Sequence, residues 1–413
     1  MNHADLEKYA RLVIKTGINL QTNQTLILSS PIECAPFARL IAEAAYTSGA
    51  RDVVMNWVDE LSAKIRYLQA PEDIFDEFPE WRKEFYLSYL RGGAAFVSIS
   101  AADPELLKDV NPEKIIRAQK ASNTALKEYR EKIMSHENSW CIVSVPTIAW
   151  AKKVFPDVSE GQAVHLLWEA ILKAVRVPAE DPVEEWNSHK SKLKERRDFL
   201  NKSNFKSLHY QNSLGTDLTI ELPEHHIWMG GSKNNAKGID FVANIPTEEV
   251  FTLPKKSGVN GIVFSSKPLV YNGNLIDHFQ LTFKEGKVID YKAEKGQEIL
   301  KKLIETDEGS CYLGEVALVP FDSPISNAQI LFYNTLFDEN ASCHLAFGKA
   351  YPTCIKDGSR LSKDQLAALG VNDSLVHVDF MIGTKDLTIT GVTAEGKQIP
   401  VFEKGNFAYV HAH

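Results

Sequence analysis

The sequence predicts two domains: an N-terminal α/β domain built on a doubly wound, mostly parallel sheet, and a C-terminal β-rich α+β domain. The chain has 413 residues, about twice the length that one ordinary core serves. Short apolar strands alternate with helices in the first part, and hairpin turns accumulate in the second. A strongly charged run over 180–202 separates the two patterns. We therefore place the domains at 1–185 and 186–413.

The N-terminal domain opens with a helix and a strand. Apolar residues recur at helical spacing over 5–18, and 25–28 is a short apolar run that is typical of a strand. Ser30 and Pro31 then give the signature of a helix start, a hydroxyl N-cap followed by proline. We expect this second helix to continue to about Gly49.

The alternation of strand and helix continues up to the charged run. Continuous apolar strands separated by helices predict a parallel sheet that helices cover on both faces. No G-x-G-x-x-G or G-x-x-x-x-G-K-[ST] pattern follows these strands, so the sequence does not indicate a nucleotide cofactor. The expected strands cover 53–55, 95–99 and 140–145, and the expected helices cover 61–69, 112–134 and 164–177.

Turn signals dominate the C-terminal domain. Glycine-containing turns between alternating apolar and polar residues predict β-hairpins. We expect few helices, such as 295–305 and the stretch near 329–337. The hairpin turns are expected at 214–217, 271–274, 284–287 and 394–397.

Composition excludes several classes of partner. The formal net charge of -8 argues against nucleic acid, because phosphate binding needs a clustered basic surface. The N-terminus lacks the basic start and apolar run of a signal peptide, and no later stretch is apolar for long enough to span a bilayer. Five scattered cysteines without C-x-x-C spacing indicate neither a disulfide framework nor a zinc knuckle. We therefore expect a cytoplasmic protein with reduced thiols and no membrane partner.

His377 and Asp379 form the first candidate site, inside the apolar stretch 375–380. Because side chains alternate along a strand, both would project from one side, about 7 Å apart. Burying an imidazole and a carboxylate costs free energy unless each finds a strong partner, and a divalent cation satisfies both. The pair therefore suggests a metal site. The alternative is a half-buried strand whose polar face meets solvent.

Three further segments carry metal-type residues. Glu248 and Glu249 are adjacent carboxylates, of which only one can face a given site in an extended segment. Glu315 is a lone acid in an apolar strand, and His344 is a lone histidine. The structural alternatives are a surface pair, an edge-strand charge and a hydrogen-bonded core imidazole. Together with the pair above, these segments supply three carboxylates and two imidazoles, enough for two divalent ions with open positions.

Several long motifs in the same order resemble one known family. They are NIPTEEVFTLP (244–254), LGEVALVP (313–320), CHLAFGKAYP (343–352) and HVDFMIG (377–383), with further similarity in WCIVSVPTIAW (140–150). Over essentially its whole length the chain resembles the thermophilic aminopeptidase family of metallopeptidases, of the aminopeptidase T, AmpS and PepS type. By this resemblance the metal ligands fall on Glu249, Glu315, His344, His377 and Asp379, and the active-site tyrosine falls on Tyr351.

The resemblance implies a metallo-aminopeptidase that removes N-terminal residues from short peptides by means of water activated by two metal ions. Glu315 is expected to bridge the ions, and Tyr351 to donate to the oxyanion. Glu248, beside a ligand, is either a general base or merely a surface charge. Mixed oxygen and nitrogen ligands suit zinc, cobalt or manganese, and the sequence does not choose among them.

The N-terminal domain carries no catalytic group that the sequence identifies. We expect it to wall off the site and to contact a second subunit, which predicts a homodimer restricted to short, unfolded peptides. Two alternatives remain open at this point. One is another dinuclear metal-dependent hydrolase, and the other is a non-catalytic binding protein that metal stabilises.

Overall fold

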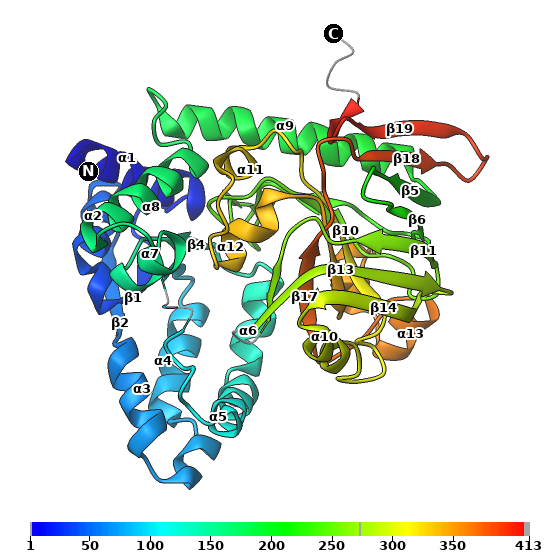
Figure 1. The fold of residues 1–413 in the computed structure, drawn as a ribbon. Coiled ribbons are helices and arrows are strands. Elements are labelled where there is room, and N and C mark those ends of the chain that lie inside the picture. The colour runs from blue at the N-terminus through cyan, green and yellow to red at the C-terminus, as the bar shows by residue number, and fades with distance from the viewer. Residues whose placement is uncertain (1, 102, 104, 272–273, 409–413) are drawn as a thin grey trace. The chain divides into compact units, whose positions relative to one another are not determined.

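A computed structural model describes residues 2–101, 103, 105–271 and 274–408. It is a mixed α/β structure with a parallel sheet and several antiparallel sheets (Figure 1). The chain forms two compact units. The first contains the chain up to Lys190 together with Ser232–Pro246, and the second contains Ser191–Gly231 and the chain from Thr247 onward. The segment Ser232–Pro246, which lies within the predicted second domain, thus groups with the first unit.

The first unit is built on a parallel sheet whose described strands have the order β2-β1-β3-β4. Its central strand β1 buries Leu26, Ile27 and Leu28, which is typical of a strand with helices over both faces. The predicted parallel sheet is confirmed. The strands are β1 (Thr25–Pro31), β2 (Asp52–Val58), β3 (Ala95–Ser100) and β4 (Trp140–Ser144).

Helices fill most of the chain between these strands, and α4 and α7 have no counterpart in the prediction. They are α1 (His3–Leu12), α2 (Ala35–Thr47), α3 (Glu60–Gln69), α4 (Glu80–Arg91), α5 (Pro112–Ala125), α6 (Lys127–Met134), α7 (Ile148–Val154) and α8 (Glu160–Ala174). The charged run forms α9 (Pro182–Ser203), which passes from the first unit into the second.

Two local helix predictions are wrong. Strand β1 stays paired with β2 as far as Pro31, so Ser30 caps no helix, and its hydroxyl instead donates to the Pro31 carbonyl at 2.9 Å. Pairing between strands outweighs the local capping signal here, and α2 starts later in the chain. The long helix expected over 112–134 is two helices, α5 and α6, which meet at Leu126.

The second unit contains two antiparallel sheets. Within the described residues, one has the order β17-β16-β15-β10-β7, and the other runs β12-β13-β11-β6-β5-β18-β19-β20, with β14 paired to β13. The strands of the first sheet are β7 (Met229–Gly230), β10 (Val250–Thr252), β15 (Leu313–Leu318), β16 (His344–Gly348) and β17 (His377–Met381). Those of the second are β5 (Ser207–Gln211), β6 (Asp217–Glu221), β11 (Val259–Phe264), β12 (Leu269–Tyr271), β13 (Asn274–Lys284), β14 (Lys287–Lys295), β18 (Thr388–Val392), β19 (Gln398–Glu403) and β20 (Asn406–Phe407).

Three predicted turns join paired strands, namely β5 to β6, β13 to β14 and β18 to β19. Strands β12 and β13 also pair, but Asn272 and Gly273 of the fourth predicted turn lie outside the described residues. The helix expected over 295–305 is α10 (Gln297–Ile304). Near 329–337 the helical segments are shorter, α11 (Pro324–Ala328) and α12 (Thr335–Asp338).

One hydrophobic core serves both sheets of the second unit. Val316, Leu345 and Phe380 of the β17-to-β7 sheet belong to the same buried cluster as Leu208 and Ile220 of the other sheet. Because successive side chains of a strand point to opposite faces, the residues between these core positions face away from the core. That second face of the β17-to-β7 sheet carries the polar residues described below.

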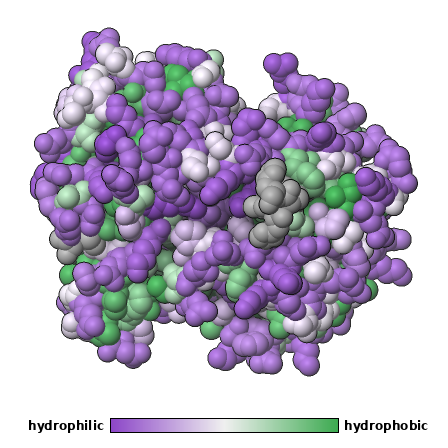
Figure 2. All heavy atoms as spheres, turned by 90° about the horizontal axis from the view of Figure 1, so that it is seen from above, coloured by the Kyte–Doolittle hydropathy of each residue, from purple (hydrophilic) through white to green (hydrophobic). Residues whose placement is uncertain are grey.

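The molecular face in Figure 2 is mainly hydrophilic, with apolar residues in small scattered groups. None of the described helices combines the length and the apolar character that crossing a bilayer requires. The five cysteines are all free and buried, in agreement with the predicted reduced thiols.

Candidate metal centre

The candidate ligands come together on one face of the β17-to-β7 sheet. In β16, Ala346 lies opposite Glu315 of β15 and opposite Asp379 of β17. Paired residues point to the same face, so both carboxylates share the face of Ala346. His344 lies two residues before Ala346, and His377 two residues before Asp379, so they point the same way. The small methyl group of Ala346 leaves room for the larger side chains around it.

A β-bulge at Gly314 lies directly before Glu315. Leu313 pairs with Phe347 and Glu315 pairs with Ala346, so Gly314 is one extra residue in β15. Glu315 alternates with the core residues Val316 and Leu318 and therefore points to the ligand face. Because of the extra residue, Leu313 nevertheless points to the core, although it precedes Glu315 by two positions.

Glu249 joins the cluster from the start of β10. Phe251 of β10 pairs with Ala317 of β15, and Ala317 pairs with His344, so Phe251 lies on the ligand face. Glu249 precedes Phe251 by two residues and points to the same side. Its Oε2 lies 3.4 Å from Nε2 of His344.

The five side chains form two groups that share Glu315. The first is Glu249, Glu315 and His344, and the second is Glu315, His377 and Asp379. Within each group the candidate ligand atoms lie within 4.8 Å of one another. Oε1 of Glu315 is 3.6 Å from Nε2 of His344, and Oε2 is 3.5 Å from Nε2 of His377. A carboxylate with this orientation can bridge two cations.

Both histidines present Nε2 to the carboxylates. Nδ1 of His344 donates to the carbonyl oxygen of Ser342 at 3.1 Å, and Nδ1 of His377 donates to that of Lys349 at 2.7 Å. A carbonyl oxygen only accepts, so each ring carries a proton on Nδ1. In the neutral ring Nε2 then has a lone pair, and beside carboxylates this nitrogen binds either a proton or a metal cation that lies between them. This is the orientation that backbone carbonyls give to metal-binding histidines.

The pKa shifts of the two histidines and of Glu315 also indicate that the site favours positive charge. Burial opposes protonation of His377, but Asp379 and Glu315 outweigh it and raise the pKa to about 9. Burial also opposes protonation of His344, and Glu249 and Glu315 again prevail and raise its pKa. The pKa of Glu315 itself is raised, first by burial and then by repulsion from Asp379. A cation among these groups is therefore strongly stabilised.

The donor set fits divalent cations. Oδ1 of Asp379 is buried and accepts no hydrogen bond within the described part of the chain, although Nε2 of His377 lies 3.5 Å away. Carboxylate oxygens and imidazole nitrogens without a thiolate suit zinc, cobalt or manganese. The ligand types, their burial and this unsatisfied oxygen all agree with a metal centre.

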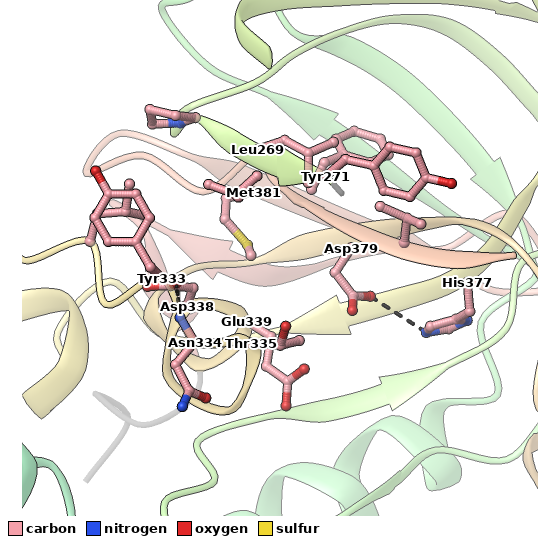
Figure 3. Close-up of a pocket in the computed structure, with 15 residues that line it drawn as sticks. Leu269, Tyr271, Tyr333, Asn334, Thr335, Asp338, Glu339, His377, Asp379 and Met381 are labelled. Atoms are coloured by element: carbon pink, nitrogen blue, oxygen red, sulfur yellow. Dashed lines mark hydrogen bonds and ion pairs between the residues drawn. The ribbon is translucent and has the colours of Figure 1, made fainter. Parts of the chain in front are cut away.

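A cavity of about 320 Å³ lies beside the second group (Figure 3). Asp379 and Glu339 line its polar part. Leu269, Tyr271 and Met381 line an apolar part, which lies across the cavity from Glu339 in Figure 3. The cavity thus combines acidic groups and an apolar wall next to the candidate metal ligands.

Glu339 is a site residue that sequence reasoning missed. It opens a short 3-10 helix, Glu339–Ala341, just before β16, and is half-buried. Burial raises its pKa, and the nearby carboxylates of Glu249 and Asp379 raise it further. The available signal was an acid only a few residues before His344.

Tyr351 and Glu248 differ in their position with respect to the cluster of candidate ligands. The Tyr351 and His377 ring centroids are 4.7 Å apart, and burial, followed by the charge of Glu315, raises the pKa of the Tyr351 hydroxyl. Tyr351 therefore lies at the cluster. Glu248 is only 2% exposed, which excludes the surface-charge alternative. It belongs to neither of the ligand groups that the described residues form.

One other structural alternative is also wrong. Glu315 is no edge-strand charge, because β15 lies between β10 and β16 and the residue is 5% exposed. His344 is buried and hydrogen-bonded, as a core imidazole would be, and its Nε2 in addition faces two carboxylates. The pair His377 and Asp379 faces this cluster and the adjoining cavity.

The fold and the site together define a candidate metal-binding protein, with carboxylate and imidazole side chains gathered on a sheet face beside a cavity. Comparison with known sequences gives the family. A sequence model of the thermophilic metalloprotease (M29) family matches residues 2–407. The chain belongs to this family, which confirms the predicted resemblance and the predicted hydrolase class.

Known relatives match over nearly the whole chain. The chain is 50% identical to aminopeptidase AmpS of Bacillus subtilis (strain 168) and 51% identical to aminopeptidase 2 of Geobacillus stearothermophilus, in each case over 98% of both chains. Its structure is similar to that of wild-type AmpT from Thermus thermophilus, with a TM-score of 0.92 and 40% identity. That match covers 98% of this chain and 99% of the other.

Proposed function

We propose that the protein is a metal-dependent aminopeptidase that releases amino acids one at a time from the free N-termini of short peptides. Full-length relatives named as aminopeptidases, at 41–51% identity, support the reaction. The proposal that two metal ions take part is supported by the Glu315 carboxylate, because its two oxygens face the histidines of different groups.

The two groups suggest how the ligands are divided. We assign Glu249 and His344 to one divalent ion and His377 and Asp379 to the other, with Glu315 shared. Zinc, cobalt and manganese all suit these ligands, because none of them requires a thiolate. Metal analysis of the purified protein decides both the number and the identity of the ions.

Divalent ions bound here would polarise the scissile carbonyl and lower the pKa of a water molecule. The Tyr351 hydroxyl, kept protonated by its raised pKa, donates to the carbonyl oxygen as negative charge develops on it. We keep Glu248 as the candidate general base, which would accept a proton from the attacking water. Its backbone N–H donates to Oδ1 of Asn340 at 2.8 Å, which fixes the segment beside the ligand Glu249.

The functional role assigned to residues 1–185 also remains a proposal. We propose that this domain limits access to the site and contacts a second subunit in a homodimer, so that only short or unfolded peptides react. A cytoplasmic location remains a prediction as well. Equal rates on a tripeptide and on the N-terminus of a folded protein would contradict the restriction by size.

One experiment tests the proposed function directly. The protein is stripped of metal, loaded with zinc, cobalt or manganese, analysed for bound metal, and assayed on free and N-acetylated aminoacyl substrates. We expect hydrolysis only when metal is bound and only when the amine is free. Hydrolysis of the acetylated substrates would indicate another metal-dependent hydrolase. Bound metal without turnover of any substrate would indicate a binding protein.

A further inference from the structure

Strand β17 carries two of the candidate metal ligands and is also an edge of its sheet. Within the described residues, it pairs with β16 on one side and with no strand on the other. An edge strand presents a row of backbone N–H and C=O groups with which another extended chain can pair. The cavity beside the candidate metal centre follows this strand, because all five residues of β17 line it.

The hydrogen bonds of β17 show which of its backbone groups point away from β16. In an antiparallel pair, residues that bond to the partner strand alternate with residues that point away from it. The N–H of Ile382 donates to the carbonyl of Cys343 at 2.8 Å, in the register of β17 with β16. The residues two and four positions before Ile382 therefore bond to β16 as well. The backbone groups of His377 and Asp379, which alternate with them, point to the free edge.

This free edge is closed at one end and open at the other. The carbonyl oxygen of Met381 also points outward and accepts from the backbone N–H of Ser266 at 2.8 Å, so the segment before β12 meets β17 there. Among the described residues, no backbone hydrogen bond from another segment reaches the outward groups of His377 and Asp379. Leu375, just before the strand, is 85% exposed, so β17 starts at the surface.

We propose that the main chain of the peptide substrate pairs antiparallel with the outer edge of β17, with its N-terminal residue near Met381 and the rest of the chain leaving past His377. The direction follows from the closed end, because an enzyme that removes single residues needs room for only one residue before the scissile bond. His377 and Asp379 supply both candidate ligand side chains and free backbone groups (Figure 3), so a chain paired here lies beside the candidate metal centre.

This proposal rests on the proposed aminopeptidase function and adds to it the way in which the substrate is held. Pairing along a strand edge uses the hydrogen-bonding groups of the main chain, which every peptide has. It therefore predicts that the enzyme tolerates many different residues after the first one.

Amide hydrogen exchange resolved to single residues tests the pairing directly. The zinc-loaded full-length protein is measured alone and with a saturating alanine pentapeptide whose first peptide bond is reduced to CH₂–NH, so that it is not hydrolysed. We expect exchange at the N–H groups of His377 and Asp379 to slow by about 10-fold, the effect of one hydrogen bond. Val378 and Phe380, which bond to β16, are the internal controls and should not change. Unchanged exchange at His377 and Asp379 would overturn the proposal.

Ester analogues of the substrate test the same pairing from the side of the peptide. In two pentapeptides, an ester oxygen replaces the N–H of the third or of the fourth residue, and the first peptide bond stays intact. Successive N–H groups of an extended chain point to opposite sides, so only one of the two faces β17. We expect kcat/KM for release of the first residue to fall by about 3- to 10-fold for one analogue and to stay the same for the other.

A loss with neither analogue, or the same loss with both, would overturn the proposal. Failure of the wild-type protein to cleave the unmodified pentapeptide would contradict the proposed function alone, because the exchange measurement does not depend on turnover.

Discussion

A Cβ atom at Gly314 would clash with the carbonyl oxygen of Gly348, because β15 and β16 approach closely at the bulge. The bulge lets Leu313 point to the core while Glu315, two residues later, points to the other ligands. Glycine is therefore required directly beside the shared candidate ligand.

Gly314→Ala should consequently impair both stability and metal binding. We expect the free energy of unfolding to fall by about 1–3 kcal/mol, the usual cost of overpacking, and the bound metal to decrease because Glu315 is displaced. Gly161→Ala is the matched control, since nothing lies within 4 Å of a Cβ at Gly161 in α8. It should raise stability by up to about 1 kcal/mol or leave it unchanged. Full metal content in Gly314→Ala would show that the bulge does not position the ligand.

The shared position of Glu315 predicts an asymmetry among ligand variants. Glu315→Gln should lower the affinity for both ions, whereas His344→Ala and His377→Ala should each weaken mainly one. Metal analysis after dialysis against graded concentrations of free zinc measures this. Loss of a single ion from Glu315→Gln would contradict the bridging role.

Tyr351→Phe separates hydrogen bonding from packing. The variant keeps the ring that packs near His377 and removes only the hydroxyl. We expect kcat to fall by about 10²- to 10³-fold, the usual effect of losing one donor to an oxyanion, with metal content unchanged. Unaltered turnover would mean that Tyr351 is a packing residue.

Glu248→Gln tests the proposed general base. Loss of a base typically lowers the rate by about 10²- to 10⁴-fold, so we expect a drop of that size in kcat with full metal content. A variant that is less stable but turns over normally would show that buried Glu248 has only a structural part.

The sequence correctly predicted the face to which side chains point where they lie in a regular strand pattern. His377 and Asp379 alternate in a strand, and this period alone places them on one face. Glu315 was singled out as a lone acid in an apolar strand, and it alternates there with the core residues Val316 and Leu318. Only the pairing with β16 reveals the bulge before it.

The remaining errors have a similar cause. Glu339 lies in a short 3-10 helix, where no periodic pattern marks the face that a side chain adopts. Ser30 carries a correct local capping signal, yet pairing of β1 with β2 keeps its backbone extended. Local patterns therefore failed wherever contacts between distant segments decide the conformation.

Asp307 forms hydrogen bonds with both chain segments that precede β15 and β17. It accepts hydrogen bonds from the backbone N–H groups of Gly309, Ser310 and Leu375 at 2.9, 2.8 and 2.5 Å, and from the hydroxyl of Ser374 at 2.8 Å. Burial alone would raise its pKa, but these hydrogen bonds outweigh burial and lower it. The ionised form of Asp307 therefore stabilises the fold that carries His377.

This pKa shift fixes the pH range in which Asp307 contributes to stability. The pKa of the folded state lies below the unfolded value of about 3.9, so the contribution is complete above that value and is lost as the pH falls through the lower, folded-state pKa. Asp307→Asn should reduce the free energy of unfolding at pH 7 by about 1–3 kcal/mol, and the difference from wild type should shrink as the pH falls below about 4. Urea unfolding between pH 7 and pH 3 measures it, with Asp290→Asn, an exposed carboxylate of β14, as the control. A difference that is the same at every pH would show that the ionised carboxylate is not what holds these segments, because groups common to both proteins cancel in the comparison.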